Sequence, residues 1–193
     1  MRVLVLYAHP VETSFHAALH RRVVESLQAA GHDVDDCDLY AENFNPVLSR
    51  EERLSYHDTS RNRAAVAPYV ERLQRAEALV LCFPVWCFGL PAILKGWFDR
   101  VLMPGVAFDI SDPAHVKPAL TNLRKIAAVT TYGRPRWMAL YMGDPPRKTI
   151  KRYLRALTGG AKVAYHAYYH MNVATPETLA RHLDHVGKKM ARF

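Results

Sequence analysis

Two kinds of hydrophobic pattern alternate along this chain. The segments 2–8 (RVLVLYA), 77–83 (EALVLCF) and 124–132 (RKIAAVTTY) are nearly continuous apolar runs. Such runs are typical of strands that are buried on both faces, as in a parallel sheet. The segments 32–40 and 162–170 also have the pattern and length of strands. The sequence therefore predicts five strands.

Helical periodicity fills the intervals between these strands. In 14–31, apolar residues recur at helical spacing, Thr13 or Ser14 can cap the helix, and Gly31 can end it. The other predicted helices are 64–76, 91–102, 147–160 and 175–192, with a short one near 49–57. Strands that alternate with helices predict an α/β fold with one doubly wound parallel sheet and helices on both faces. A length of 193 residues favours a single domain over 1–193.

Three stretches carry neither pattern, and we expect loops at 41–62, 103–123 and 133–146. In doubly wound sheets, ligands bind beyond the carboxyl ends of the strands. The unusual loops of this chain follow strands in this way: HPVETSF follows the first, PVWCFG the third and TYGRPRW the fourth.

Composition narrows the class of protein. Hydrophobic residues make up 50% and charged residues 23%, which is ordinary for a globular protein. No apolar run approaches the roughly 20 residues that span a membrane, and VLVLYA is too short for a signal peptide. We therefore expect a cytoplasmic protein. Cys37, Cys82 and Cys87 lack CxxC spacing, which favours free thiols over a redox pair.

The formal net charge is +8, with the densest basic segments at 147–155 and near the end of the sequence. A basic balance can indicate nucleic acid, anionic lipid or a phosphorylated ligand. The chain has no nucleic-acid-binding signature, so we expect no nucleic-acid partner. A basic face that attracts a phosphorylated cofactor explains the charge, although a solvated surface explains it equally well.

The first loop has the features of a phosphate site. Thr13 and Ser14 stand at a predicted helix N-terminus, where free N–H groups and the helix dipole favour anions. The loop lacks the glycines of GxGxxG and of a P-loop. The same two hydroxyls could equally be plain caps, and His9 could be a buried structural histidine.

The second and third loops carry aromatic and basic residues. Trp86 and Phe88 could flank a flat conjugated ring, or could cover the end of the sheet. In the third loop, Gly133 permits close approach, and Arg134 and Arg136 could meet a phosphate or lie in solvent.

Other chemistries find little support in the sequence. There is no GxSxG elbow and no HExxH spacing, and we expect no metal. His166 and His170 should share one face of the fifth strand as packing or hydrogen-bonding residues, with a zinc site as the less favoured alternative. A chain without a strong chemical group of its own usually relies on a cofactor.

Three segments together resemble a known family: AHPVETSFHAAL, DLYAENFNPVLSREE and FPVWCFGLPAILKGWFDRVLMPGVAF. They resemble the NAD(P)H:quinone oxidoreductases of the DT-diaphorase type, which also include bacterial modulators of drug activity and ancillary subunits of potassium-efflux systems. The resemblance is strongest over residues 1–108 and weak after about residue 134. It implies a flavodoxin-like fold with strand order 2-1-3-4-5. It also implies a ping-pong reaction in which NAD(P)H reduces a bound flavin and a quinone then takes two electrons.

The resemblance also implies a set of site residues. The flavin ring would lie against Pro84, Val85, Trp86, Cys87 and Phe88. The phosphate region would be held by His9, Thr13, Ser14, Phe15 and Ala17. The other edge would be closed by Thr130, Thr131, Tyr132 and Gly133. Members form homodimers, so Phe108 would reach across the interface and contact substrate together with Trp86.

The chain departs from the family after the fourth strand. The animal members carry a Tyr and a His there that stabilise the reduced flavin, whereas Met142 stands near the expected position of the His. Tyr132 replaces a glycine, and Trp137 or Tyr141 is a candidate substitute for the missing Tyr. The family's contacts to adenine are not recognisable, which leaves FMN open, but the long loop after the second strand favours FAD.

Three other functions remain open from sequence alone. The chain could be a flavin- and nucleotide-binding regulatory subunit that docks on a membrane transporter. It could be an electron-carrier flavodoxin, although such carriers are usually acidic. It could also be a binding module that has lost its flavin. The sequence does not choose among planar acceptors or between NADH and NADPH, for which Arg134 and Arg136 are candidate determinants.

Overall fold

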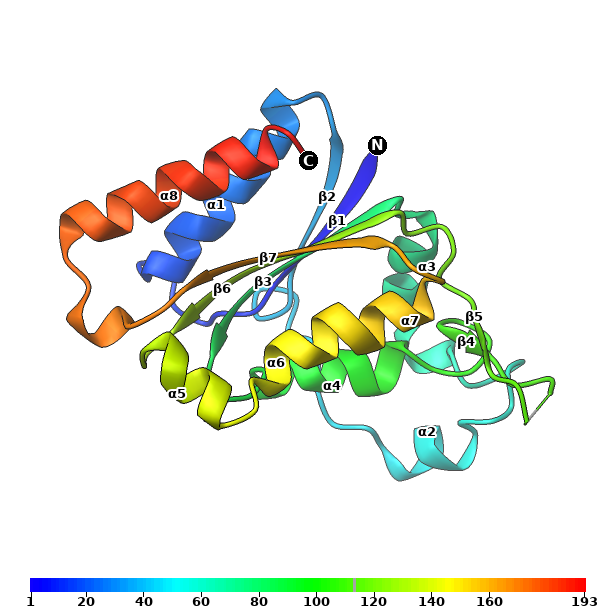
Figure 1. Ribbon diagram of the computed structural model, residues 1–193. Helices are drawn as coiled ribbons and strands as arrows, with labels where there is room; N and C mark the ends of the chain where they lie inside the picture. Colours follow the sequence, from blue (N-terminus) through cyan, green and yellow to red (C-terminus); the bar gives the residue numbers. More distant parts are fainter. Residues whose placement is uncertain (113) are drawn as a thin grey trace.

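Five parallel strands form the centre of the molecule (Figure 1), in a computed structural model that describes residues 1–112 and 114–193. The strands are β1 (Arg2–Tyr7), β2 (Asp33–Asp38), β3 (Ala78–Val85), β6 (Lys125–Tyr132) and β7 (Lys162–Tyr168). Their spatial order is β2-β1-β3-β6-β7, and every neighbouring pair is parallel. Counted along the chain this is 2-1-3-4-5, so the predicted fold class and strand order are confirmed.

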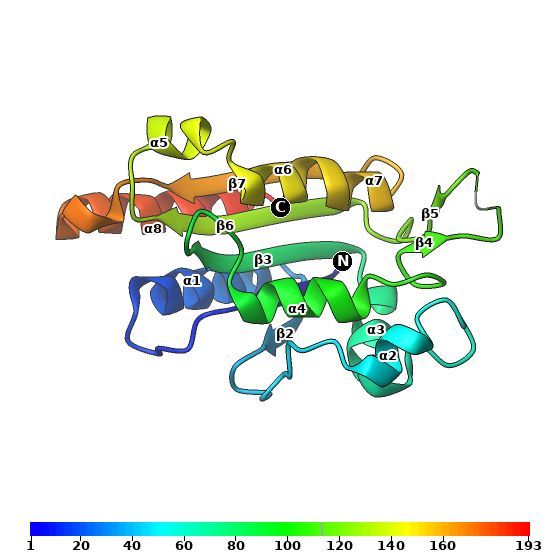
Figure 2. The same cartoon turned by 90° about the horizontal axis from the view of Figure 1, so that it is seen from below.

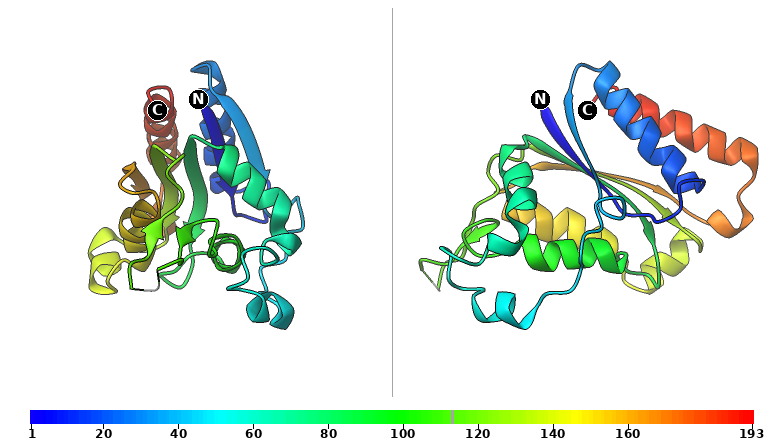
Figure 3. Two further views of the ribbon diagram at one scale, coloured as in Figure 1. Left: turned by 90° about the vertical axis from the view of Figure 1, so that its right-hand side faces the viewer. Right: turned by 180° about the vertical axis from the view of Figure 1, so that it is seen from behind.

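Helices cover both faces of the sheet (Figures 1 and 3). One face is covered by α1 (Phe15–Ala29) and α8 (Pro176–Met190). The other is covered by α3 (Ala67–Arg75), α4 (Ala92–Val101) and the helical segment 145–157. Strand residues alternate between the two cores: Val3 and Val5 pack toward α1 and α8, whereas Leu4 and Leu6 pack toward α3 and α4. Burial on both faces explains the continuous apolar runs.

Local capping sets the start of α1 and of α8. Ser14 rather than Thr13 caps α1, because its Oγ accepts the amide hydrogen of Ala17 at 3.0 Å. Gly31 follows the end of α1 with a φ of 78°, a conformation that favours glycine. Thr175 caps α8, and Pro176 begins it. These starts and stops agree with the sequence pattern.

Two expected loops contain secondary structure. Within 103–123, β4 (Phe108–Asp109) pairs with β5 (Lys117–Pro118) as a short antiparallel ribbon. Within 133–146, α5 (Arg136–Tyr141) and the start of α6 (Pro145–Lys148) are helical. Periodicity misses these elements because each is only two to six residues long. The third predicted loop, 41–62, contains the short helix that the sequence predicts near 49–57. This helix is α2 (Arg50–Leu54).

Two further expectations were wrong in detail. The helix predicted over 147–160 starts at Pro145 and changes to a π-helix, η2 (Thr149–Leu154), before α7 (Arg155–Leu157). His166 and His170 do not share a strand face, because β7 ends at Tyr168 and His170 has a φ of 67°. Short 3-10 turns complete the described structure: η1 (Ala64–Val66) precedes α3 and η3 (Met171–Val173) follows β7.

The described residues contain no helix that is both long enough and apolar enough to cross a membrane.

Candidate functional site

A cavity of about 270 Å³ lies at the carboxyl ends of β1, β3 and β6, where the strand order reverses. We call it the switch-point pocket. Its lining consists of His9, Ser14, Phe15, His16, Pro84, Val85, Trp86, Thr131, Gly133, Met171 and Asn172. The three loops that the sequence singled out therefore meet in one place, as expected for a doubly wound sheet.

The β1–α1 loop forms one wall of the switch-point pocket. The amide of Val11 donates to Nδ1 of His9 at 3.0 Å, which fixes the imidazole ring. Ser14 accepts from Ala17, so the amides of Phe15 and His16, which have no intrahelical acceptor in the first turn, remain for a ligand. Together with the positive end of the α1 dipole, these donors form a suitable site for phosphate.

The β3–α4 turn forms the opposite wall in a strained conformation. Trp86 and Gly89 exchange two backbone hydrogen bonds, of 2.8 and 3.3 Å, across the turn. Cys87 and Phe88 between them have φ angles of 49° and 56°, which non-glycine residues rarely adopt. Such strain persists where the surrounding structure enforces it, and it concentrates at functional sites. The turn leaves the Trp86 side chain 41% exposed, with its ring centroid 5.7 Å from that of His9.

The end of β6 sends consecutive side chains to opposite faces of the sheet. Thr131 lies on the α1 face, where its Oγ1 is 3.4 Å from Nδ1 of His16. The ring of Tyr132 points the other way, and its hydroxyl donates to Oδ1 of Asp144 at 2.6 Å and is 2.6 Å from the hydroxyl of Tyr165. Burial, followed by the neighbouring Tyr165 and Asp144, raises the pKa of Tyr132 far above its ordinary value. Tyr132 is therefore a neutral donor whose ring does not line the switch-point pocket.

His16 is the most informative lining residue that the sequence interpretation missed. Its side chain is 3% exposed, and its Nε2 has no hydrogen-bond partner among the described residues. Burial, reinforced by the nearby His9, His20 and His182, lowers the pKa of His16 to about 3. The ring is therefore neutral at pH 7, and one ring nitrogen can serve a ligand. Its position directly after Phe15 at a helix start was the available sequence signal.

Met171 and Asn172 were also missed. They follow β7 in η3, and a Cβ on Gly133 would lie 3.0 Å from Oδ1 of Asn172. The approach of these two segments requires a small residue at Gly133. The sequence around Met171 contains no pattern that predicts this contact.

Several expected site residues do not line the switch-point pocket. Thr13 is exposed, Ala17 contributes its amide to the Ser14 cap, and Cys87 and Phe88 form the strained turn. Thr130 is fully buried on the α4 face, with no hydrogen-bond partner for its hydroxyl among the described residues.

The remaining expected residues lie away from it. Phe108 lies in β4, toward the opposite end of the sheet from α5 (Figures 1 and 2). Trp137 and Tyr141 project from α5 and are 63% and 83% exposed.

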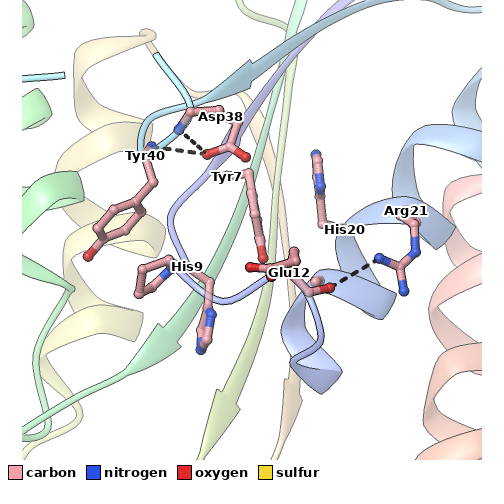
Figure 4. A pocket seen from close by; sticks show the side chains of 10 residues that line it. Tyr7, His9, Glu12, His20, Arg21, Asp38 and Tyr40 are labelled. Atoms are coloured by element: carbon pink, nitrogen blue, oxygen red, sulfur yellow. Dashed lines mark hydrogen bonds between the residues drawn. The ribbon is translucent and has the colours of Figure 1, made fainter. Parts of the chain in front are cut away.

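A second cavity of about 460 Å³ adjoins the β1–α1 loop on the side of β2 (Figure 4). We call it the β2-side pocket, lined by Tyr7, His9, Pro10, Glu12, Ala17, His20, Arg21, Asp38, Tyr40 and Ala41. His20 stacks on Tyr7 with ring centroids 4.1 Å apart and contacts Asp36 at 2.7 Å. Asp38 accepts hydrogen bonds from the amides of Tyr40 and Ala41.

The two pockets share His9 but differ in charge. The β2-side pocket contains the carboxylates of Glu12 and Asp38 and the single guanidinium of Arg21, so its acids outnumber its arginine and disfavour an anionic ligand. A phosphate is therefore better accommodated in the switch-point pocket. Metal binding has no support, because the described part of the chain contains no cluster of three or more His, Cys, Asp or Glu side chains suited to a metal ion.

A doubly wound parallel sheet whose loops meet in a pocket at its switch point defines a class of α/β proteins that bind ligands at that place. The chain belongs to the family described as having a flavodoxin-like fold, whose model matches residues 1–190.

Individual relatives agree with this assignment. NAD(P)H dehydrogenase [quinone] 1 of Rattus norvegicus is 35% identical over 149 residues, which cover 68% of this chain and 54% of that protein. The chain thus spans about half the length of the curated relatives it matches. Two solved structures resemble it over nearly their whole length. Smu.1420 from Streptococcus mutans UA159 has a TM-score of 0.86 at 26% identity, covering 100% of both chains. The NAD(P)H:quinone oxidoreductase from Methanothermobacter marburgensis has a TM-score of 0.85 at 27% identity, covering 99% of this chain and 98% of that one.

Proposed function

We propose that this protein is a flavin-dependent NAD(P)H oxidoreductase that delivers two electrons to quinones or similar planar acceptors. The observation that carries the proposal is the switch-point pocket, where the start of α1 faces a strained aromatic turn. The similarity to a quinone dehydrogenase over 68% of the chain, and to a quinone oxidoreductase structure over 99% of it, supports the same conclusion.

The residues present fit a phosphorylated flavin on two counts. The unpartnered, buried Nε2 of His16 lies in the wall of a pocket that offers amides for a phosphate. Trp86 offers a partly exposed ring of the kind that stacks on planar partners. When bound, a flavin supplies hydride acceptance from NAD(P)H and two-electron transfer to the acceptor.

The chain's own residues would bind and orient these groups. Ser14, Phe15 and His16 would hold the phosphate, while Pro84, Val85 and Trp86 would border the ring. Thr131 and Gly133 would close the other edge. Because the strained turn is fixed by the Trp86–Gly89 hydrogen bonds, its backbone amides are oriented before the ligand arrives, which reduces the entropy lost on binding. The positive end of α1 would also favour the negative charge that a flavin gains on reduction.

The identity of the flavin, the assembly and the location remain predictions. FAD was expected, but FMN needs only the phosphate site and the ring site described above. A homodimer agrees with the exposure of Trp137, Leu140, Tyr141 and Met142 on and next to α5. In such a dimer, Phe108 would contact substrate in the partner's pocket, and Trp137 or Tyr141 would approach the flavin edge. Docking on a membrane transporter finds no supporting feature in the described residues, and a cytoplasmic location is still an expectation.

The visible spectrum of the purified protein tests the proposal. A yellow protein that bleaches with anaerobic NADPH or NADH in one two-electron step, and recovers on addition of a quinone, is the expected result. The mass of the released cofactor then distinguishes FMN from FAD. A Trp86→Ala variant should bind flavin more weakly, whereas Tyr153→Ala serves as the control, because Tyr153 is an exposed aromatic residue that does not line the switch-point pocket. A colourless protein that ignores added FMN and FAD would overturn the proposal.

A further inference from the structure

Four basic side chains share one face of the helical segment 145–157. Arg147 and Lys151 are four residues apart, as are Lys148 and Arg152. Like charges at this spacing repel each other and destabilise an isolated helix. None of the ion pairs found between described residues includes any of the four. These four cations are therefore not neutralised by an ion pair within the described structure, and an anion from outside the chain can bind them.

These cations surround a cavity of about 540 Å³, which we call the α6 pocket. Its lining consists of Leu140, Gly143, Asp144, Arg147, Lys148, Lys151 and Arg152. Asp144 is the single acid in this lining; it is 4% exposed, and its Oδ1 accepts from Tyr132. The cations outnumber this one buried carboxylate, so an anion in the pocket meets a positive surface.

The backbone around the α6 pocket is irregular in two places. Lys151 and Arg152 belong to η2, a π-helical stretch of six residues. Stretches of π-helix are rare and occur often at functional sites. Gly143 has a φ of 80°, and a Cβ there would lie 3.5 Å from Nζ of Lys148. Together the tight turn at Gly143 and the π-helix bring the basic side chains to one cavity.

The α6 pocket lies next to the switch-point pocket. The ring of Tyr132 reaches Asp144 in the wall of the α6 pocket, and the following residue, Gly133, lines the switch-point pocket. The linings of the two cavities thus both connect to the end of β6, through Tyr132 on one face of the sheet and Gly133 beside it. A ligand that extends from one cavity to the other would pass over this end of β6.

The chemistry of the proposed reaction leaves the phosphate groups of the nicotinamide nucleotide without an assigned site. The flavin phosphate has its site at the start of α1, so the α6 pocket would serve the other phosphorylated reactant. NADPH carries a phosphate on the 2′ position of its adenosine ribose, whereas NADH has a hydroxyl there. Arginine and lysine near a ribose are the usual means of holding that 2′-phosphate.

We propose that the α6 pocket binds the 2′-phosphate of NADPH through Arg147, Lys148, Lys151 and Arg152, and so gives the enzyme a preference for NADPH over NADH. The inference rests on the proposed function. The proposal assigns the preference for NADPH to these four residues and not to Arg134 and Arg136, because neither of those arginines lines the α6 pocket. The carbonyl of Arg134 accepts a hydrogen bond from the amide of His170, and Arg136 begins α5.

The test uses fragments of the nucleotide, so that it does not depend on turnover. Calorimetric titration of the purified protein with 2′,5′-ADP should show binding at least tenfold tighter than with 5′-ADP. A Lys151→Gln/Arg152→Gln variant should lose about tenfold in affinity for 2′,5′-ADP and little for 5′-ADP. Each exposed charge pair contributes only a small binding free energy, but the two contributions add. In turnover, the same variant should lose about tenfold in kcat/KM with NADPH and keep its value with NADH.

An Arg155→Gln/Lys188→Gln variant controls for net charge. It removes the same charge from positions outside the α6 pocket, one of them on the neighbouring helix α7. Equal binding of 2′,5′-ADP and 5′-ADP would overturn the proposal, and so would an equal loss of affinity in the control variant. Discrimination of the 2′-phosphate by a protein that binds no flavin would retain this phosphate site while rejecting the oxidoreductase function.

Discussion

The hydroxyl of Tyr132 donates a 2.6 Å hydrogen bond to Oδ1 of Asp144, and both side chains are more than nine-tenths buried. The other carboxylate oxygen of Asp144 has no partner within the described structure. Asp144 also has a φ of 44°, at the junction between α5 and α6. This single contact therefore ties the end of β6 to the segment that carries the exposed aromatic residues and the basic face.

We predict that Tyr132→Phe destabilises the fold. The substitution leaves a buried carboxylate without its donor, which should lower the free energy of unfolding by about 1–3 kcal/mol. Urea unfolding monitored by circular dichroism measures this loss. Tyr153→Phe is the matched control, because Tyr153 is 44% exposed. A loss of equal size in both variants would show that the Tyr132–Asp144 bond contributes nothing specific.

The two hydroxyls at the start of α1 should behave differently. Ser14→Ala removes the cap on the Ala17 amide and should lower the free energy of unfolding by about 1 kcal/mol. Since Ser14 also lines the switch-point pocket, flavin affinity should fall as well. Thr13→Ala should change neither quantity, because Thr13 does not cap the helix and does not line the pocket. Thermal unfolding and flavin titration of both variants compare the two positions.

The strained turn yields a stabilising substitution. Cys87 has a φ of 49°, so Cys87→Gly should remove a steric cost of about 1 kcal/mol and raise the free energy of unfolding. Cys87→Ala keeps the Cβ and should give no such gain. Denaturant titration of the two variants side by side isolates the backbone effect. If Gly and Ala at position 87 give equal stabilities, the turn is not strained in solution.

Buried histidines should make the protein sensitive to acid. Burial lowers the pKa of His16 to about 3 and of His182 to about 4, and it also lowers the pKa of His166. Each is a base with a folded-state pKa below its unfolded value near 6.5, so the unfolded chain binds more protons between those values. Stability is therefore full above about pH 6.5 and declines as the pH falls toward 4.

Urea midpoints between pH 7.5 and 4.5 measure this decline. His182 meets the ring of Tyr168 edge-on and stacks on His185 between β7 and α8, so a His182→Leu variant should show a shallower decline than the parent protein. His115→Leu is the control, because His115 is exposed and pairs with Asp112. Parallel curves for the parent and His182→Leu would contradict the assignment of acid sensitivity to this cluster.

The strands and long helices could be predicted from sequence because their signal is local. The run RVLVLYA reports burial on both faces of β1, and Ser14 stands where a cap belongs. The parts that could not be predicted depend on distant residues. Nothing near Tyr132 indicates that its hydroxyl meets Asp144 twelve positions later and Tyr165 on the neighbouring strand.

The same distinction applies to the site. The loops that end β1, β3 and β6 were identified correctly as its walls, because all follow strands of one parallel sheet. His16 was missed because the apolar periodicity of an amphipathic helix predicts only apolar residues at buried positions, and His16 is a polar residue at such a position. Asn172 was missed because it comes to Gly133 only through the turn after β7.

His9 forms part of the wall of both the switch-point pocket and the β2-side pocket. The two cavities are therefore not independent compartments. A small molecule that turns the His9 ring on entering the β2-side pocket must break its bond from Val11 and reshape the wall that faces the other cavity. Reciprocity of binding free energies then requires each occupant to change the affinity of the other by one common factor. A ligand of the β2-side pocket would thus alter what the switch-point pocket binds without entering it.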